Sequence, residues 1–309
     1  MSGTNALKEA VERDPDLDWE QDFVQKARGN AFYQRVLREG LFSDMSQALG
    51  AVQDKVLTAA KRMAVGRDII WMVPTDQPLT RFYLAKRGAV SRVGETKGLE
   101  IGERFTKTDI QLAYEYTYDA AFTQSYIEDV PFFVLERAPA DGGQLLEEQV
   151  TKDIMALYEG VAAGNLAGGA EISATNAGTL AWADIVKARQ AARKEGFNPD
   201  VCIVHPDQIA DLWSDDKFIH GFYFGEKVDV ERGLLGSTYL GLRIVETDLA
   251  TAAKCHVLDS KVAAACLMRR DIMSQPYEVP NELREGVMVS VRYGLGTLRT
   301  TAIARITGC

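Results

Sequence analysis

Two cysteines and two histidines stand in close pairs along the last third of the sequence. Cys202 precedes His205 by three positions, and Cys255 directly precedes His256. Thiolates and imidazoles at such short spacing are the ligands of tetrahedral zinc sites. Adjacent residues of a strand, however, point to opposite faces of a sheet, so Cys255 and His256 could hardly reach one ion. The pattern is more typical of cysteines buried as small apolar side chains, and we expect no metal site.

A second candidate for chemistry is His205 followed by Asp207, a combination that suggests general acid–base catalysis. The intervening Pro206 is better interpreted as the first residue of a helix, where a missing N–H costs nothing, with His205 next to the cap. Asp259 stands in an Asp-Ser-Lys sequence that fits a polar turn between two strands. We therefore expect none of these residues to be catalytic.

The sequence contains none of the short motifs that carry well-known enzymatic chemistry. There is no His-Glu-x-x-His, no Gly-x-Ser-x-Gly, no phosphate loop ending in Gly-Lys-Ser/Thr and no Cys-x-x-Cys. The glycines at 233, 236 and 241 are too irregular for a dinucleotide fingerprint. Only three histidines are available for acid–base work. We expect a protein that is not an enzyme and that binds no cofactor.

The composition is that of an ordinary globular protein with an acidic surplus. Lys and Arg number 35 against 44 Asp and Glu, a net charge of −9. Gripping nucleic acid as a main task needs a surplus of basic residues, so this charge argues against that class. The four cysteines lie far apart and no signal peptide is recognisable, so we expect a cytosolic chain with reduced thiols. No apolar run approaches the ~20 residues that cross a bilayer, and we expect no membrane role.

The first 66 residues are expected to form amphipathic helix. Ser43 or Asp44 can cap a helix, and Gly40 and Gly66 bracket the segment as suitable helix ends. Apolar residues recur between them every three or four positions. They are Met45, Leu49, Val52, Val56, Ala60 and Met63.

A strand pattern follows, from residue 69 to about 118. Residues 70–73 predict a strand that Pro74 stops, and from Ile110 to Tyr118 every second residue is apolar or aromatic, which predicts one half-buried strand. Between these strands lies a polar, glycine-rich stretch, residues 86–98. Loops of this length are usually functional or disordered. Two strands joined in this way would protrude from a globular body.

A long helix comes next, followed by alternating elements. One apolar stripe of about five turns predicts the helix, which glycines at 164, 168 and 169 are expected to end. The stripe consists of Leu146, Val150, Ile154, Leu157 and Val161. We expect a second helix over 179–196, a buried strand at 201–204, a short helix over 206–213 and two late strands over 287–293 and 298–306.

Several sequence blocks carry a resemblance to a known family. The strand at 201–204 runs into His-Pro-Asp-Gln-Ile-Ala-Asp-Leu, and a Gly-Leu-Leu-Gly-Ser-Thr-Tyr-Leu-Gly-Leu-Arg-Ile-Val block follows at 233–245. Blocks at 257–272 and 291–294 complete the series. In this order and spacing they resemble major capsid proteins of tailed phages and tailed archaeal viruses. That family builds icosahedral shells with the Hong Kong-phage-type capsid fold, an α+β fold that encapsulin nanocompartments share.

The resemblance implies a division of the chain into five segments. An N-terminal arm would reach a neighbouring subunit, an extended β-hairpin loop (E-loop) would lie over an adjacent copy, and an axial domain would surround the shell's symmetry axes. The implied segments are the arm at 1–66, the E-loop and flanking strands at 67–120, the peripheral domain with a long spine helix at 121–175, the axial domain at 176–265, and the return strands of the peripheral domain at 266–309.

The resemblance also implies the function and the partners. The chain would be a structural major capsid protein that assembles with itself into pentamers and hexamers around double-stranded DNA, with little specific contact to that DNA. A mildly acidic subunit suits such a shell, although negative charge also simply aids solubility. Portal, scaffolding and decoration proteins would be further partners. The protein would be located in the virion after assembly in the host cytoplasm.

Charged residues of the loop are the candidates for contacts between subunits. Basic side chains there would pair with acidic groups on a neighbour, or would form a merely solvated charged loop; each exposed pair contributes only ~0–1 kcal/mol. The basic candidates are Arg81, Lys86, Arg87, Arg92 and Lys97, and the acidic ones are Glu136, Asp141, Glu147 and Glu148.

The arm carries further basic residues that would line the inner surface and touch DNA, or would simply be solvated. They are Lys55, Lys61, Arg62 and Arg67. The 66 residues before the first strand are too few for a cleavable scaffolding extension of about a hundred residues, so we expect a separate scaffolding protein or none. The founding phage joins subunits by a Lys–Asn bond, for which Lys86 and Lys97 are the nearest loop lysines, but no local motif supports an assignment.

Two other functions remain as alternatives. An encapsulin-like shell that encloses a cargo enzyme would use the same fold. A soluble α/β enzyme is motivated only by the His205 turn and the Cys/His pairs.

Overall fold

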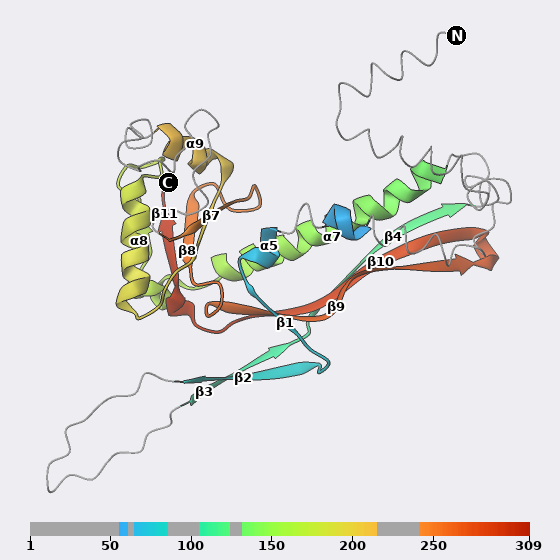
Figure 1. Cartoon of the computed structure of the whole chain (residues 1–309), viewed down its shortest axis with the longest axis horizontal. Coiled ribbons are helices and arrows are strands. Elements are labelled where there is room, and N and C mark those ends of the chain that lie inside the picture. Colours follow the sequence, from blue (N-terminus) through green and yellow to red (C-terminus); the bar gives the residue numbers. More distant parts are fainter. Residues whose placement is uncertain (1–55, 61–64, 86–104, 124–131, 215–240) are drawn as a thin grey trace, which may run out of the picture. The chain divides into compact units, whose positions relative to one another are not determined.

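The structure, a computed structural model, describes residues 56–60, 65–85, 105–123, 132–214 and 241–309. The chain divides into two compact units. Of the described residues, the first unit contains 56–60, 117–123, 132–145 and 272–290, and the second contains all others. Helices and strands occur in mixed order along the chain (Figure 1), and the predicted α+β class is confirmed.

A five-stranded sheet lies in the second unit. Its order is β5-β11-β8-β6-β7, with β6 parallel to β7 and antiparallel to β8. All four residues of β6 are buried, as the continuous apolar run of Val, Cys, Ile and Val predicted. The strands are β5 (Ile172–Ser173), β6 (Val201–Val204), β7 (Arg243–Glu246), β8 (Lys254–Leu258) and β11 (Ile303–Thr307).

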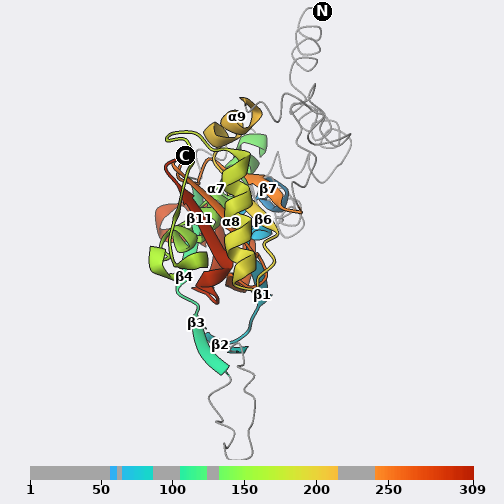
Figure 2. The ribbon, with the colours of Figure 1, turned by 90° about the vertical axis from the view of Figure 1, so that its left-hand side faces the viewer.

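Two helices pack with this sheet. Figures 1 and 2 show α8 (Trp182–Lys194) lying along it, and α9 (Pro206–Ser214) follows β6 directly. The indole N–H of Trp182 donates to the carbonyl of Leu212 at 3.2 Å and so joins the two helices. At the start of α9, the His205 amide donates to the side-chain oxygen of Gln208 at 3.0 Å. This is a helix cap, and the interpretation of Pro206 as the first helical residue is confirmed.

The long helix α7 (Phe132–Glu159) is 28 residues long and begins well before Leu146, where the apolar stripe starts. Its early part contains the sequence Ala-Pro-Ala-Asp-Gly-Gly, which is typical of a turn rather than a helix. A Cβ atom at Gly142 would lie 2.3 Å from the ring of Tyr118, and one at Gly143 would lie 2.8 Å from the carbonyl oxygen of Val56. The glycines therefore allow close packing within the first unit and do not end the helix.

A four-stranded sheet has the order β1-β9-β10-β4, and β1 pairs with β9 in parallel. The predicted strand at 70–73 and the one at 287–293 are both confirmed within it. A separate two-stranded sheet is the hairpin of β2 and β3. These strands are β1 (Trp71–Pro74), β2 (Leu79–Ala85), β3 (Phe105–Gln111), β4 (Tyr114–Thr123), β9 (Ala264–Val279) and β10 (Arg284–Thr297).

The single strand predicted from Ile110 to Tyr118 is wrong. The predicted alternation of burial is present, but the chain leaves β3 after Gln111 and enters β4 at Tyr114, in a different sheet. The amide of Leu112 donates to the carbonyl of Pro78 at 3.1 Å, which ends the hairpin at this point. Side-chain alternation does not reveal a change of partner strand, because it has the same period in both sheets.

The last strand also differs from its prediction. The alternation over 298–306 predicted one strand that returns to the peripheral domain, but a 3₁₀ turn (Thr300–Ala302) delays β11 until Ile303. β11 then pairs with β5 and β8, in the same sheet as β6. The last strand thus begins five residues later than predicted and belongs to the sheet that contains β6.

The predicted N-terminal helix lies mostly outside the described residues. Residues 56–60 are helical, with Val56 buried. Gly66 lies inside the short helix α5 (Val65–Asp68) rather than at a helix end, and its amide donates to the hydroxyl of Thr151 at 3.2 Å. Among the described helices, none has both the length and the apolar character that a membrane span requires.

Candidate assembly surface

The hairpin of β2 and β3 is anchored through one of its two faces. Phe82 of β2 and Ile110 of β3 pack in one apolar cluster with Ala265 and Leu267 of β9 and with Leu298. Successive side chains of a strand point to opposite faces, so the neighbours of these residues lie on the outer face. The hairpin thus has a fixed inner face and an outer face that no described residue covers.

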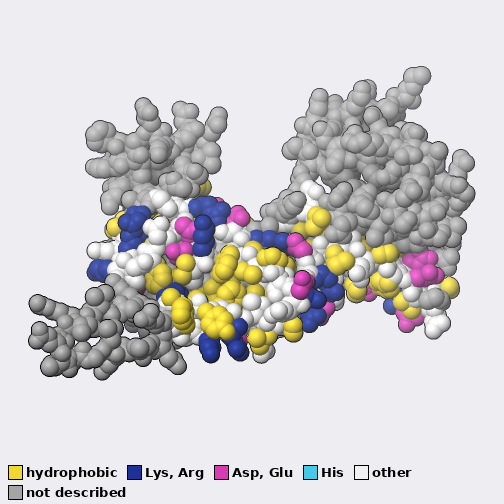
Figure 3. Space-filling view, turned by 60° about the horizontal axis from the view of Figure 1, so that its bottom comes forward, with side chains coloured by type: hydrophobic (Ala, Val, Ile, Leu, Met, Phe, Trp, Pro, Cys, Tyr) yellow, Lys and Arg dark blue, Asp and Glu magenta, His cyan; other side chains and the backbone are white. Residues whose placement is uncertain are grey.

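The outer face of the hairpin carries two exposed aromatic side chains. Tyr83 is 61% exposed and Phe105 is 55% exposed. On the same face, Arg81 donates to Asp109 directly across the two strands at 2.7 Å. That hydrogen bond holds the pKa of Asp109 below its usual value. Figure 3 shows exposed hydrophobic side chains beside Lys and Arg side chains on the described surface of the molecule.

Trp71 of β1 exposes a third aromatic ring beside the hairpin, next to its inner face rather than its outer one. Its ring meets that of Phe82 edge to face, with 5.8 Å between centroids, and its side chain is still 43% exposed. Large aromatic side chains are enriched at interfaces. The arrangement is therefore suited to contact with another protein surface.

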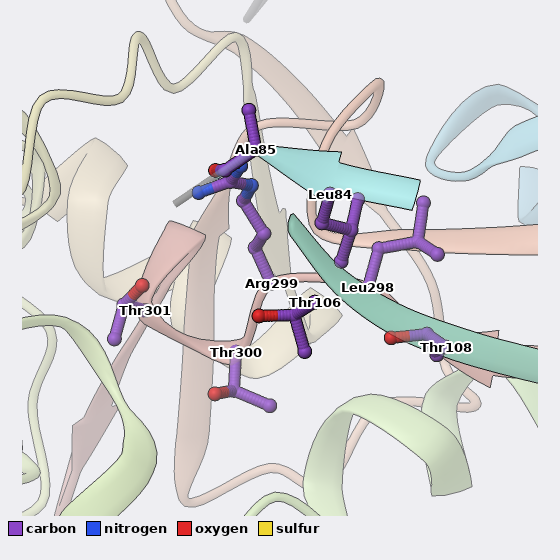
Figure 4. A pocket seen from close by; sticks show the side chains of 8 residues that line it. All are labelled: Leu84, Ala85, Thr106, Thr108, Leu298, Arg299, Thr300 and Thr301. Atoms are coloured by element: carbon purple, nitrogen blue, oxygen red, sulfur yellow. The ribbon is translucent and has the colours of Figure 1, made fainter. Parts of the chain in front are cut away.

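A hollow of about 230 Å³ lies where the hairpin meets the connection from β10 to β11. Figure 4 shows Arg299 reaching toward Ala85 and Leu84 lying beside Leu298. The guanidinium of Arg299 donates to the carbonyl of Ala85 and lies 5.9 Å from the ring centroid of Phe197. The lining residues are Leu84, Ala85, Thr106, Thr108, Leu298, Arg299, Thr300 and Thr301.

An ion-pair cluster joins α5, α7 and β9 within the second unit. Arg67 donates two hydrogen bonds to Glu147, each 2.8 Å long, and two more to Asp271. The side chain of Glu147 is completely buried. Glu147 is thus bound within its own chain and offers no carboxylate to a neighbour, which makes its prediction as an intersubunit partner wrong. For the same reason Arg67 carries no uncompensated charge for DNA.

Of the other charged residues proposed from the sequence, some are described by the structure and some are not. Arg81 is described and bound to Asp109, while Glu148 pairs with Lys152 at 2.7 Å. Asp141 is exposed. Outside the described residues lie Lys55, Lys61, Arg62, Lys86, Arg87, Arg92, Lys97 and the side chain of Glu136.

The cysteine and histidine pairs do not form a metal site. The sulfur atoms of Cys202 and Cys255 lie 3.6 Å apart and fully buried, while His256 belongs to the opposite face of β8 and pairs in register with Arg305. The contact with Cys202 and burial raise the pKa of Cys255, so its thiol stays protonated. Within the described ranges no group of three or more His, Cys, Asp or Glu side chains can hold a metal ion.

The end of α7 is held by a buried arginine. One terminal nitrogen of Arg305 donates to the carbonyls of Tyr158, Glu159 and Val161 at 2.8 to 3.0 Å, and the other donates to Glu171. A cation here satisfies the carbonyls that a helix end leaves free. The neighbouring His256 has no exposed surface, and neither of its ring nitrogens has a hydrogen-bond partner among the described residues.

Solved structures with the same architecture are capsids and related particles. The capsid of Cyanophage P-SCSP1u matches with a TM-score of 0.61 and 14% identity, over 78% of this chain and 86% of that one. Mycobacterium phage Che8 matches with a TM-score of 0.59 and 15% identity, over 75% and 85%. A virus-like particle from Pyrococcus furiosus matches with a TM-score of 0.56 and 13% identity, over 84% and 99%. The chain has the Hong Kong-phage-type capsid fold.

This likeness lies in the fold rather than in close sequence identity. No protein-family model matches the sequence, and no curated protein matches it. The predicted fold class and resemblance are nevertheless confirmed at the level of the fold.

Sequence reasoning missed the aromatic face and the hollow. A signal for the aromatic face was present, because residues 79–85 alternate and place Tyr83 opposite Phe82 and Leu84. The hollow had no such signal, since Thr106 and Arg299 are far apart in the sequence and are brought together only by the hairpin's packing on Leu298.

Proposed function

We propose that the chain is the major capsid protein of a tailed virus, a structural subunit that assembles into pentamers and hexamers of an icosahedral shell. The observation that carries this proposal is the outer face of the β2–β3 hairpin, where Tyr83 and Phe105 are each more than half exposed. An isolated two-stranded ribbon is marginally stable in water. A second copy lying over this face would bury the aromatic rings and stabilise the ribbon.

The charge supports a shell that encloses double-stranded DNA without binding it tightly. The net charge is −9, and the one arm residue of the DNA hypothesis that is described, Arg67, is bound by Glu147 and Asp271. In this proposal the protein is assembled in the host cytoplasm and resides in the virion. Portal, scaffolding and decoration proteins complete the particle, and no membrane takes part.

Loop contacts remain part of the proposal in a reduced form. The basic residues at 81, 86, 87, 92 and 97 would face Glu136, Asp141 and Glu148 of a neighbour, without Glu147. Exposed pairs of this kind contribute ~0–1 kcal/mol each. Most of the assembly free energy would therefore come from apolar burial at interfaces of roughly 1,200–2,000 Å² repeated around the shell.

The alternative is an encapsulin-like compartment around a cargo enzyme, which the same fold allows. The similarity to the virus-like particle from Pyrococcus furiosus extends over 99% of that particle's chain. This similarity keeps the alternative open. The contents of purified particles separate the two: DNA resistant to added nuclease supports the virus, and a co-purifying enzyme supports the compartment.

Size-exclusion chromatography followed by negative-stain microscopy of the expressed chain tests the proposal. We expect closed particles, or rings of five and six copies, that far exceed a monomer in size. Assembly should be tried with and without a co-expressed scaffolding protein from the same gene neighbourhood. A chain that stays a monomer or dimer under both conditions, and in crowded solution, contradicts the proposal.

A further inference from the structure

The hollow beside the hairpin contains a fixed cation and several unused hydroxyl groups. Among the described residues no carboxylate pairs with Arg299, which contacts the carbonyl of Ala85 and the ring of Phe197. The hydroxyls of its four lining threonines make no hydrogen bond within the described chain. These are Thr106, Thr108, Thr300 and Thr301.

We propose that this hollow receives an aspartate or glutamate side chain from a second copy of the chain. The inference rests on the proposed function and names the chemistry of one contact in the shell. A guanidinium carries five N–H donors, and Arg299 uses only part of them in its hydrogen bond to the carbonyl of Ala85. Charge-assisted hydrogen bonds from the remaining donors, together with threonine hydroxyls, are what a carboxylate needs when it leaves water.

The size of the hollow and the charge of the chain both favour this occupant. About 230 Å³ admits one carboxylate side chain but lies below the range of roughly 300–1,000 Å³ that small-molecule sites usually have. The chain has 44 acidic residues against 35 basic ones, so a second copy presents surplus carboxylates to an arginine that has no carboxylate partner among the described residues.

The position of the hollow links it to the proposed assembly surface. Thr106 and Thr108 are on the inner side of the same hairpin whose outer side exposes Tyr83 and Phe105. The hollow and the aromatic face thus belong to opposite sides of one narrow hairpin, and a copy that wraps around the hairpin's edge would contact both. The two contacts of Arg299 hold its side chain in place before any partner arrives, which lowers the entropic cost of binding.

Chemical cross-linking within assembled particles tests the proposal directly. The variant Arg299→Lys keeps the positive charge and adds an amine, which a carbodiimide couples to a carboxylate only at contact distance. Particles are assembled from equal amounts of ¹⁵N-labelled and unlabelled chains, cross-linked and digested. We expect peptides that join position 299 to an Asp or Glu peptide of the other isotope. Cross-links only between peptides of one isotope, or none at position 299, overturn the proposal.

A charge-removing variant gives a second, quantitative readout. Arg299→Gln keeps a donor for the Ala85 carbonyl but loses the charge, and we expect the concentration at which particles appear to rise about tenfold. Arg269→Gln is the matched control, because Arg269 already pairs with Asp76 of its own chain. Melting of the unassembled subunit should be the same for both variants.

The outcomes separate this inference from the proposed function. If the wild-type chain forms particles while Arg299→Gln assembles at the wild-type concentration, the inference fails and the shell function stands. If the wild-type chain forms no particles at all, both the proposed function and the inference are contradicted.

Discussion

Acid should destabilise the second unit through His256. This side chain has no exposed surface, and charged groups surround it on three elements: Arg305 on β11, Lys254 on β8 and Glu159 at the end of α7. Burial, and then the positive charge of Arg305, lower the pKa of His256 to about 4. Its imidazole is therefore neutral in the folded protein over a pH range in which an unfolded chain binds a proton.

The magnitude follows from the two pKa values. A histidine in an unfolded chain has a pKa of about 6.5, so between pH 6.5 and 4 the unfolded state binds more protons than the folded state. Stability is thus complete above pH 6.5 and is lost as the pH falls toward the folded pKa. The loss from His256 alone is about 1 kcal/mol at pH 5.5 and about 2–3 kcal/mol at pH 4.5.

Urea unfolding of the unassembled subunit at a series of pH values measures this loss. The variant His256→Leu has a similar volume and no titrating group, so the difference in unfolding free energy between wild type and variant should shift by about 2–3 kcal/mol from pH 7.5 to 4.5. The control His205→Asn removes a histidine that caps α9. This variant should still lose the unfolding free energy that protonation of His256 costs at acidic pH. A wild-type–variant difference that is constant across this pH range would refute the reasoning.

Three further predictions concern packing, a buried ion pair and assembly. Gly142→Ala should destabilise the first unit by ~1–3 kcal/mol in thermal melting, although alanine favours helices, because the new methyl group overlaps the ring of Tyr118. Arg67→Met should cost ~3–5 kcal/mol in urea unfolding, because the buried Glu147 carboxylate loses its counter-charge, and Glu147→Leu in the same chain should recover most of this loss. Tyr83→Ser should change subunit stability by less than ~0.5 kcal/mol but slow particle formation in light scattering.

Matched variants decide each of these three cases. Gly164→Ala adds a methyl group where nothing lies within 4 Å, so a loss as large as that at Gly142 would contradict the steric explanation. A double variant of the ion pair that is no more stable than Arg67→Met would show that the pair is not the cause. Tyr83→Phe keeps the aromatic ring, and equal assembly defects in both Tyr83 variants would mean that ring burial is not what the hairpin contributes.

The sequence allowed prediction of elements wherever one pattern covered a whole element. The buried strand β6 and the helix α9 were predicted correctly, because an unbroken apolar run and a proline at a helix start have only one reasonable interpretation. The resemblance then supplied the architecture that these local patterns cannot provide. The fold class was confirmed in this way although identity to solved structures is only 13–15%.

Predictions failed where tertiary contacts override local preference. The first half of α7 contains a proline and two glycines, residues that favour turns, yet it is helical, and its glycines allow the close approach of Tyr118 and Val56. Glu147 has the sequence context of a surface acid, and its burial depends on Arg67, 80 positions earlier. A local sequence pattern cannot reveal a contact between residues that are 80 positions apart.

The hairpin explains how one segment can serve both the folded subunit and the assembly. Its inner face is held by apolar contacts with Leu298, and the end of β2 is held by the hydrogen bond from Arg299 to the carbonyl of Ala85. The same guanidinium lines the hollow in which we place a neighbour's carboxylate. A carboxylate bound there would draw on donors of Arg299 that Ala85 does not use, so docking would strengthen the anchor rather than compete with it. Loss of the Arg299 charge should therefore weaken assembly more than it weakens the free subunit, and this difference distinguishes an interface residue from a purely structural one.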